Sequence, residues 1–553
     1  MYARHAYHRA YAGVVALKQV DRFEDGLIRA IGQPQIQKHL GPLALESTIG
    51  PLLLAERKMS KKKNMANESV VSLNSGKVIG FQAGGCYAWL GIPYAQAPIG
   101  ALRLRGPQPV TPWAGVREAT SFGSACSQIV GPRLQHAKPG FDENCLYLNI
   151  WSPSPDKQLR PVMIWIHGGG FVQTSANMYV GAHFAASHDV VVVTMNYRLG
   201  VFGFVNFGSL PGGGGIESNL GLRDQIAAME WVRDNIAGFG GDLNKVTLAG
   251  QSAGAVSVSL HMLSQASTRL FHKAIVGSGV NNLIHEEATS RRIAALYAEE
   301  LKLGANAAED LRMLHPSQLL SAQRAVRKRL PNMLPASPWF DGDLLPERFR
   351  GSEATPTPAI PLMAGFTRDE IRLFELVPGN KSMPMKRQEI AILLEQQLGK
   401  ERADKILAAY PANRDGQRSL ATDAIFGLPT IQFAVRHAES RPSWLYRFDA
   451  PNPLLGAAHG LDLWYVWNLT GLLGAMMRGG PLLGRRKALA QRMREHWAHF
   501  IRHGSPGGDW PAFDSNSYMT KLFNLEDDCI TSDPQANRRV AWAGEAIVPA
   551  GFS

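Results

Sequence analysis

The sequence predicts an α/β fold with a large, mostly parallel central sheet and helices on both of its faces. Three short segments are uninterrupted runs of apolar residues, many of them β-branched, as expected of strands buried on both sides: 162–166, 190–195 and 245–249. Between the last two, residues 223–236 place apolar side chains at helical spacing. Buried strands that alternate with helices are typical of a parallel sheet.

The chain after this region continues the same pattern. Further strands are expected at 272–276, 360–364 and 444–448, and a hairpin at 70–73 and 77–81 turns around Asn74-Ser75-Gly76. Three longer segments, 285–335, 389–409 and 456–505, are expected to be mainly helical insertions that cover the sheet edge and the active site. We therefore predict a single domain over residues 67–553.

Residues 1–66 differ from the rest in composition. They have weak periodicity and carry about half of the net charge of +12 in a chain of 553 residues. We expect a poorly structured basic extension, and Met59 or Met65 could serve as an alternative start. The remaining charge is spread thinly and forms no basic stripe interleaved with aromatic residues, so nucleic-acid binding is not expected.

The apolar residues suggest neither a membrane span nor an export signal. No run of 18 apolar residues occurs, so stable membrane insertion is not expected. The apolar stretch at 12–17 is too short for a secretory signal. A cytoplasmic location is therefore expected, and a secreted or periplasmic one if the true start differs.

The cysteines give no metal signal. The chain has 4 of them, none in a C-x-x-C pair, and no histidine cluster at ligand spacing accompanies them, so a zinc site is not expected. Cys126 and Cys145 are close enough in sequence for a disulfide that closes a short loop. Two buried free thiols fit this spacing equally well, and the spacing leaves both alternatives open.

The pentapeptide Gly250-Gln251-Ser252-Ala253-Gly254 lies between the strand at 245–249 and a segment, 255–263, that reads as a helix. A serine between two glycines at a strand-to-helix junction is the arrangement of a nucleophile elbow. The sharp turn requires residues without bulk on both sides of Ser252. The helix that follows offers free N–H groups to an oxyanion that forms at this serine.

A serine hydroxyl needs a base, and the base needs a partner that fixes its tautomer. Two acid candidates, Asp369 and Glu370, follow the strand at 360–364, and His459 follows the strand at 444–448 among small residues. The chain order of serine, acid and histidine is the one found in hydrolases of this elbow type. Sites on parallel sheets lie at the carboxyl ends of the strands, where these residues are expected.

A glycine-rich turn supplies a candidate oxyanion hole. His167-Gly168-Gly169-Gly170-Phe171 follows directly after the strand at 162–166. Consecutive glycines allow backbone N–H groups to turn toward one point, and each such donor contributes roughly 3 kcal/mol of transition-state stabilisation. The glycines at 212–215 have no helix directly behind them and read as a loop.

These motifs occur together with others in a fixed order. The chain resembles the type-B carboxylesterase and lipase family, which includes the cholinesterases and has the α/β-hydrolase fold; within it the chain looks like a bacterial carboxylesterase. The resemblance runs from about residue 69 to 548. It rests on Leu90-Gly91-Ile92-Pro93-Tyr94-Ala95, Cys145-Leu146-Tyr147-Leu148-Asn149-Ile150, His167 to Phe171, Asn196-Tyr197-Arg198-Leu199-Gly200, Phe239-Gly240-Gly241-Asp242, the elbow, Asp369-Glu370 and His459.

The resemblance implies specific roles for residues of this chain. It implies a catalytic triad of Ser252, Glu370 and His459, and so favours Glu370 over Asp369. It also implies oxyanion donors at Gly169, Gly170 and Ala253, a hydrogen bond from Ser278 to Glu370, and an ion pair between Arg103 and Glu143. It further implies a disulfide between Cys126 and Cys145, and an acyl pocket lined by Phe171, Leu334, Trp339 and Phe340.

The implied function is that of a serine carboxylesterase acting on short- to medium-chain carboxylic esters through an acyl-enzyme on Ser252. It needs no cofactor and no metal, and its partner is a small-molecule ester; the protein is expected to be a monomer or a small homo-oligomer. A lipase or an amide or carbamate hydrolase on the same triad is the alternative. A non-catalytic adhesion-type relative is disfavoured because the three triad residues are present.

The sequence also departs from the family pattern near the triad. Gln251 stands where the family mostly has glutamate, which removes a negative charge near His459 and predicts weaker stabilisation of the imidazolium. Asn144 replaces an acidic residue, and Asp462 stands where glutamate is usual after the histidine. The segment 126–145 is short and has no tryptophan, which argues against choline esters and against a large lid.

Overall fold

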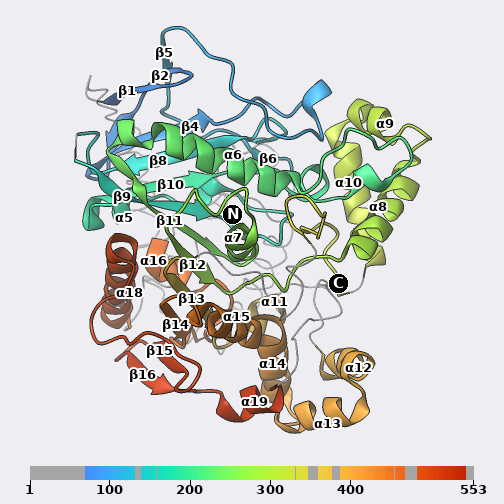
Figure 1. The fold of residues 1–553 in the computed structure, drawn as a ribbon, viewed down its shortest axis with the longest axis vertical. Helices are drawn as coiled ribbons and strands as arrows, with labels where there is room; N and C mark the ends of the chain where they lie inside the picture. The colour runs from blue at the N-terminus through green and yellow to red at the C-terminus, as the bar shows by residue number, and fades with distance from the viewer. Residues whose placement is uncertain are drawn as a thin grey trace, which may run out of the picture.

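The structure, a computed structural model, describes residues 69–130, 139–156, 158–330, 332–346, 359–375, 386–453, 455–467 and 482–543. The extension expected at residues 1–66 lies outside these ranges. Within them the dominant element is a sheet of 11 strands in the order β16-β15-β14-β13-β12-β11-β9-β10-β8-β4-β3. Figure 1 shows this sheet running through the middle of the molecule with helices on either side.

The sheet is parallel in its middle and antiparallel at both edges. Parallel pairing runs from β10 through β9, β11, β12, β13 and β14 to β15. Antiparallel pairs join β10 to β8, β8 to β4, β4 to β3, and β15 to β16. The strands are β3 (Phe81–Ala83), β4 (Cys86–Pro93), β8 (Tyr147–Ser152), β9 (Arg160–Ile166), β10 (Val191–Met195), β11 (Gly241–Gln251), β12 (Lys273–Gly277), β13 (Leu362–Thr367), β14 (Ser443–Phe448), β15 (Met519–Phe523) and β16 (Cys529–Ser532).

Both faces of the sheet are buried, as the apolar strands predict. Along β9, Val162, Ile164 and Ile166 belong to one hydrophobic core, and Met163 and Trp165 belong to the other. Helices α6 (Leu220–Asn235), α7 (Ala253–Leu263) and α15 (Leu428–Ala438) pack into the first core. Helices α5 (Ala182–His188), α16 (Leu463–Trp467) and α18 (Leu483–His503) pack into the second. The predicted α/β architecture is confirmed.

The helical insertions also occur where the sequence predicts them. The segment 285–335 forms α8 (Glu287–Leu301), α9 (Ala307–Met313) and α10 (Pro316–Arg329), which group together beside the sheet in Figure 1. The segment 389–409 forms α12 (Arg387–Leu398) and α13 (Lys400–Ala408), close to α14 (Arg414–Thr422) and α19 (Ala536–Ala541). Residues 468–481 of the third helical segment lie outside the described ranges.

The predicted hairpin is present at the start of the described chain. Strands β1 (Val70–Leu73) and β2 (Gly76–Ile79) pair antiparallel, and β5 (Val116–Glu118) joins β2 to make a small separate sheet. The second strand ends at Ile79 and not at Phe81, because Phe81 begins β3 of the large sheet. The hairpin therefore leads directly into the main sheet edge.

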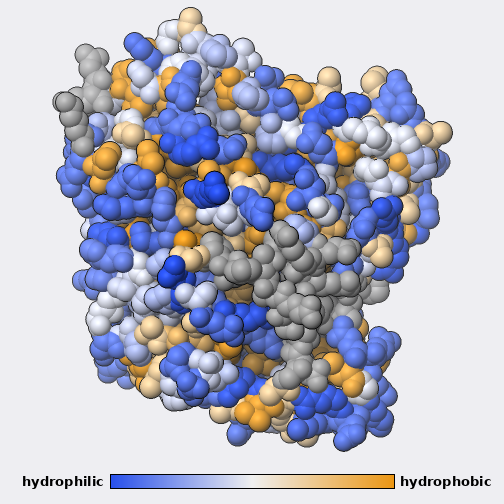
Figure 2. All heavy atoms as spheres, viewed as in Figure 1, coloured by the Kyte–Doolittle hydropathy of each residue, from blue (hydrophilic) through white to orange (hydrophobic). Residues whose placement is uncertain are grey.

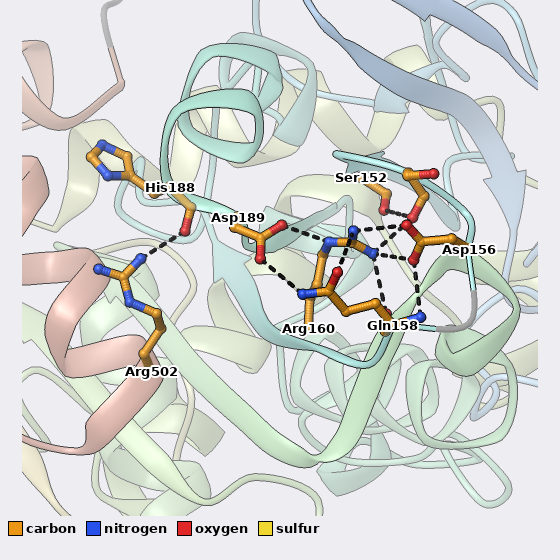
Figure 3. Close-up of polar contacts among 8 residues, drawn as sticks. Ser152, Asp156, Gln158, Arg160, His188, Asp189 and Arg502 are labelled. Carbon is orange, nitrogen blue, oxygen red and sulfur yellow. Dashed lines mark hydrogen bonds and ion pairs between the residues drawn. The ribbon is translucent and has the colours of Figure 1, made fainter.

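Arg160 anchors the amino-terminal end of β9, the end opposite to the catalytic motifs. Its guanidinium contacts Asp189 and Asp156, each at 2.6 Å, and donates to the carbonyl of Gln158 at 3.1 Å. Figure 3 shows these groups converging on Arg160 from the connections that flank the strand. The contact with Arg160 lowers the pKa of the Asp156 carboxyl to about 2. The cluster thus fixes the start of the strand that leads to the glycine-rich turn.

The surface shown in Figure 2 intersperses hydrophilic residues with small hydrophobic patches. Among the described residues, no helix combines the length and the apolar character needed to cross a membrane. The described part of the chain also contains no group of three or more His, Cys, Asp or Glu side chains arranged to hold a metal ion.

Cys126 and Cys145 are not joined by a disulfide. Both are buried free thiols. The Cys126 sulfur accepts the backbone N–H of Leu199 at 3.2 Å. Burial raises the pKa of the Cys145 thiol well above its usual value, so the reactive thiolate is disfavoured. Of the two alternatives that the spacing left open, the structure has the free thiols, and the disulfide implied by the resemblance is absent.

Candidate active site

Ser252 lies in a strained turn between β11 and α7. Its backbone angles are φ 57° and ψ −130°, outside the regions that most residues adopt. Its N–H donates to the carbonyl of Gly277 at 2.8 Å, and its carbonyl accepts from Val256 at 2.9 Å. A Cβ on Gly254 would lie 2.1 Å from the carbonyl oxygen of Ile166, so only glycine fits there. The turn has the geometry of the predicted elbow.

His459 and Glu370 form the shortest polar contact of this site. The Nδ1 of His459 lies 2.5 Å from Oε2 of Glu370, whose side chain is 0% exposed. The other carboxylate oxygen accepts the backbone N–H of Thr367 at 2.7 Å. Because both carboxylate oxygens have donors, Glu370 can fix the imidazole with its proton on Nδ1 and a lone pair on Nε2.

Asp369, the other acid candidate, contacts the loop that carries His459. Its backbone N–H donates to the carbonyl of Ala457, and its carboxylate accepts the N–H of Ala457, both at 2.9 Å. The loop that carries His459 is thereby joined to the end of β13. Of the two neighbouring acids, Glu370 contacts the histidine and Asp369 holds its loop.

Gln251 contacts the other ring nitrogen of His459. Its side-chain nitrogen lies 3.1 Å from Nε2 of His459, and the side chain is buried. Among the hydrogen bonds of the described residues, Nε2 is thus contacted by Gln251 and not by the hydroxyl of Ser252. Hydrogen bonds in resting sites are often incomplete until a substrate binds. The structure brings His459 and Glu370 together, and the residue before Ser252 contacts the same histidine.

Two phenylalanine rings that no sequence motif indicates pack on His459. The ring centroids of Phe374 and Phe426 lie 5.0 and 4.9 Å from that of His459. Phe374 stands four residues after Glu370, in α11 (Ile371–Glu375), a spacing that brings side chains to one helix face. Phe426 lies in a π-helical turn, Asp423–Gly427, for which the sequence carries no comparable signal.

The glycine-rich turn lies directly against the elbow. A Cβ on Gly168 would be 3.0 Å from Cβ of Ser252, and Gly169 and Gly170 have φ of 106° and 60°. His167 braces the turn through its Nδ1, which lies 2.9 Å from the hydroxyl of Thr174. Burial lowers the pKa of His167 to about 4, so this side chain is neutral at pH 7. The turn thus lies against Ser252, and its role as an oxyanion hole stays a prediction.

The hydrogen bond expected between Ser278 and Glu370 is not formed, so this prediction is wrong. The backbone N–H of Ser278 donates to the carbonyl of Gly365 at 2.8 Å, and its φ is 54°. Its hydroxyl is buried and has no hydrogen-bond partner. The oxygens of Glu370 are engaged by Thr367 and His459 instead. Ser278 therefore serves the site through its backbone, which links β12 to β13.

Asp462 is buried close to the same acid. One oxygen accepts from the hydroxyl of Tyr446 at 3.4 Å, and the other has no partner. Burial and the nearby charge of Glu370 raise the pKa of Asp462 to about 7. A carboxyl that titrates near neutrality thus lies behind the triad candidates.

The four residues expected to line an acyl pocket have different surroundings. A Cβ on Gly170 would be 3.7 Å from Leu334, which places Leu334 beside the glycine-rich turn. Phe171 packs against Phe204 at 4.9 Å between ring centroids. The backbone of Trp339 is hydrogen-bonded to Asn219, and that of Phe340 to His285. Leu334 has the position expected of a pocket residue, and the pocket role of all four stays a prediction.

The implied Arg103–Glu143 ion pair is present at 2.6 Å.

The fold is that of an α/β-hydrolase, with the strand-to-helix elbow, the histidine loop and the glycine-rich turn at one end of its sheet. A model of the carboxylesterase family matches residues 67–542. The chain belongs to the carboxylesterase family, and its relatives are carboxylic ester hydrolases.

Individual relatives cover most of the chain. It is 34% identical over 485 residues to the para-nitrobenzyl esterase of Bacillus subtilis, and the aligned region covers 85% of this chain and 97% of that protein. It is 33% identical over 518 residues to the acetylcholinesterase of Bungarus fasciatus, covering 83% and 84% of the two chains. Among solved structures, a thermophilic PNB esterase is similar with a TM-score of 0.77 and 32% identity, covering 86% of this chain and 100% of that one.

Proposed function

We propose that this carboxylesterase acts through a triad of Ser252, His459 and Glu370 on short- to medium-chain carboxylic esters. The observation that carries the proposal is the 2.5 Å contact between His459 and Glu370 beside the strained turn of Ser252. A serine at the start of a helix, an imidazole and a buried carboxylate are the parts that acyl transfer requires.

Catalysis then proceeds in two steps of acyl transfer. His459 takes the proton of Ser252 while the serine oxygen bonds to the ester carbonyl carbon, and it returns that proton to the departing alcohol. The charge on the carbonyl oxygen is held by the N–H groups of Gly169, Gly170 and Ala253. In the second step His459 activates water, which releases the carboxylic acid and restores Ser252.

The preference for short and medium acyl chains rests on sequence and surroundings. The segment 126–145 is too short to supply a large lid, and Leu334 stands close to the glycine-rich turn, where an acyl chain would lie. Relatives named as a cocaine esterase of Oryctolagus cuniculus and a phenmedipham hydrolase of Pseudarthrobacter oxydans are 33% and 32% identical to this chain. The esterase name supports an ester substrate for this site, and the hydrolase name leaves the alternative of another bond type to be tested.

The deciding experiment measures hydrolysis of p-nitrophenyl esters from acetate to palmitate by the parent and by Ser252→Ala. We expect the highest kcat/KM at short to medium chains and a loss of more than about 10³-fold in the variant. A serine-directed fluorophosphonate should transfer its phosphonyl group to the peptide that contains Ser252, with loss of fluoride and the serine proton. A maximum at palmitate would indicate a lipase instead. Equal turnover by Ser252→Ala would refute the assigned nucleophile.

A further inference from the structure

The amide of Gln251 contacts Nε2 of His459, the ring nitrogen that must accept a proton in general-base catalysis. Nδ1 is committed to Glu370, so Nε2 carries the lone pair and the amide nitrogen at 3.1 Å donates to it. The hydroxyl of Ser252, the next residue along the chain, requires the same nitrogen as its proton acceptor. Two neighbouring side chains therefore compete for one lone pair.

The contact is built into the site and does not depend on a surface side chain. Gln251 is 5% exposed. Two glycines lie beside it: a Cβ on Gly460 would be 3.6 Å from its amide nitrogen and a Cβ on Gly277 would be 3.6 Å from its Cγ, which are ordinary van der Waals distances. Phe374 and Phe426 pack on the imidazole and limit its rotation. Amide and ring are thus both held in place.

We propose that Gln251 is a positioning residue whose amide N–H occupies the Nε2 lone pair of His459 in the resting enzyme and extends activity toward acidic pH. An amide N–H stabilises the imidazole lone pair, whereas an imidazolium would turn its own N–H toward that donor. A carboxylate at this position would do the reverse, because it attracts the imidazolium. The proposal rests on the triad described under the proposed function.

Proton transfer then includes an exchange of partners at Nε2. The amide of Gln251 leaves the nitrogen as the Ser252 hydroxyl takes its place, the hydroxyl proton moves to Nε2, and the serine oxygen bonds to the acyl carbon. The proton passes to the departing alcohol as the ester C–O bond breaks. Gln251 neither gains nor loses a proton in these reaction steps, which distinguishes it from a catalytic residue.

Other titratable groups around the ring must be separated from this effect. Glu370 faces Nδ1, Asp462 lies within electrostatic reach of both Glu370 and His459, and Tyr446 is hydrogen-bonded to Asp462. Asp462 carries a buried carboxyl and comes from the loop after the histidine. Its effect on the pH dependence can be removed with Asp462→Asn, which leaves the Gln251 contact in place.

The test is the pH profile of kcat/KM for p-nitrophenyl butyrate between about pH 5 and pH 9. We expect Gln251→Glu to move the acid limb upward by about one pH unit, which is about a tenfold loss on the acid side. Gln251→Met, which has a similar length and no donor, should move it in the same direction by less. Gln491→Glu makes the same charge change on an exposed part of α18 and should leave the limb unchanged.

Two results would overturn the proposal. One is an acid limb for Gln251→Glu that coincides with that of the parent while thermal melting shows a folded protein. The other is a shift that disappears in the Asp462→Asn background, since Asp462 would then carry it. Failure of the triad itself looks different, because the parent would then not be labelled at Ser252 by a fluorophosphonate.

Discussion

Asp369 and Ala457 exchange two hydrogen bonds of 2.9 Å, one between their backbones and one from the backbone of Ala457 to the Asp369 carboxylate. The partners come from the end of β13 and from the loop that carries His459. This pairing fixes how far the imidazole stands from Glu370, which follows Asp369 directly. An acid that contacts no reacting atom can therefore govern catalysis.

Asp369→Ala should lower kcat by about 10- to 100-fold with little change in KM, because the loop of His459 loses its hydrogen bond to the Asp369 carboxylate and small displacements cost this much. Asp369→Asn keeps an oxygen acceptor for Ala457 and serves as the matched control, with a loss of less than about threefold. Steady-state kinetics on p-nitrophenyl butyrate give both values. Equal effects of the two variants would contradict the role of the hydrogen bond.

Glu370→Gln should lower kcat by about 10³- to 10⁴-fold. The amide oxygen can still accept from Thr367, and this orientation turns the NH₂ group toward Nδ1 of His459. The imidazole would then carry its proton on Nε2, the wrong tautomer for a base. Thermal melting should show a folded variant. Activity within tenfold of the parent would exclude Glu370 as the orienting acid.

Asp224→Ala should lower the free energy of unfolding by about 3 to 5 kcal/mol, because it leaves the buried guanidinium of Arg198 without its partner. The two side chains are 0% and 2% exposed and lie 2.6 Å apart. Glu287→Ala removes the partner of Arg291 from an exposed pair and should change the free energy of unfolding by less than about 1 kcal/mol. Urea unfolding followed by circular dichroism compares the two, and similar losses would contradict the prediction.

The carboxyl of Asp423, at the start of the π-helical turn that carries Phe426, gives a pH prediction. Burial raises its pKa from 3.8 to about 6, so the folded state binds more protons than the unfolded state between these values. This group therefore lowers the stability of the parent as the pH rises from about 4 to about 6, by up to about 3 kcal/mol. Relative to the parent, Asp423→Asn should gain stability over this interval and no further above it. Unfolding free energies at about pH 4, 5, 6 and 7 test this, and a constant difference would contradict it.

Gly254→Ala should prevent normal folding or abolish activity, since its Cβ would approach the carbonyl of Ile166 to 2.1 Å. Gly484→Ala makes the same change in the first turn of α18, where nothing lies within 4 Å, and should leave folding and activity unchanged. Expression, thermal melting and ester hydrolysis report both effects. A folded and fully active Gly254→Ala would show that the elbow tolerates a larger residue.

The strands and the elbow could be predicted because their causes are local. Apolar runs such as 162–166 define buried strands, and glycines around Ser252 define the turn. Strands β8, β15 and β16 were not identified: polar residues such as Asn149 and Lys521 interrupt the apolar runs of the first two, and β16 is a partly exposed edge strand with a weak apolar signal. Helix α6 begins at Leu220, three residues before the predicted start, because Gly221 does not extend the apolar periodicity.

The contacts around His459 depended on segments distant in sequence. The spacing could not choose between Asp369 and Glu370, because both follow the same strand; the choice came from the resemblance, and the structure adds the separate contact of each. The bond expected from Ser278 fails because Thr367, three residues before Glu370, already supplies a donor. Phe426 reaches the histidine through a π-helical turn, which no periodicity of the sequence indicates.

Strand β12 lies between the strand that leads to the nucleophile and the strand that leads to the acid, and it limits which substitutions the site can accept. Ser252 follows β11 and Glu370 follows β13, and the end of β12 binds both neighbours through the carbonyl of Gly277 and the N–H of Ser278. This strand contributes spacing and no chemistry. A substitution that displaces this backbone would therefore change the separation of the serine and the acid without removing a reactive group; a Cβ on Gly279, for example, would lie 2.7 Å from the carbonyl oxygen of Ser252.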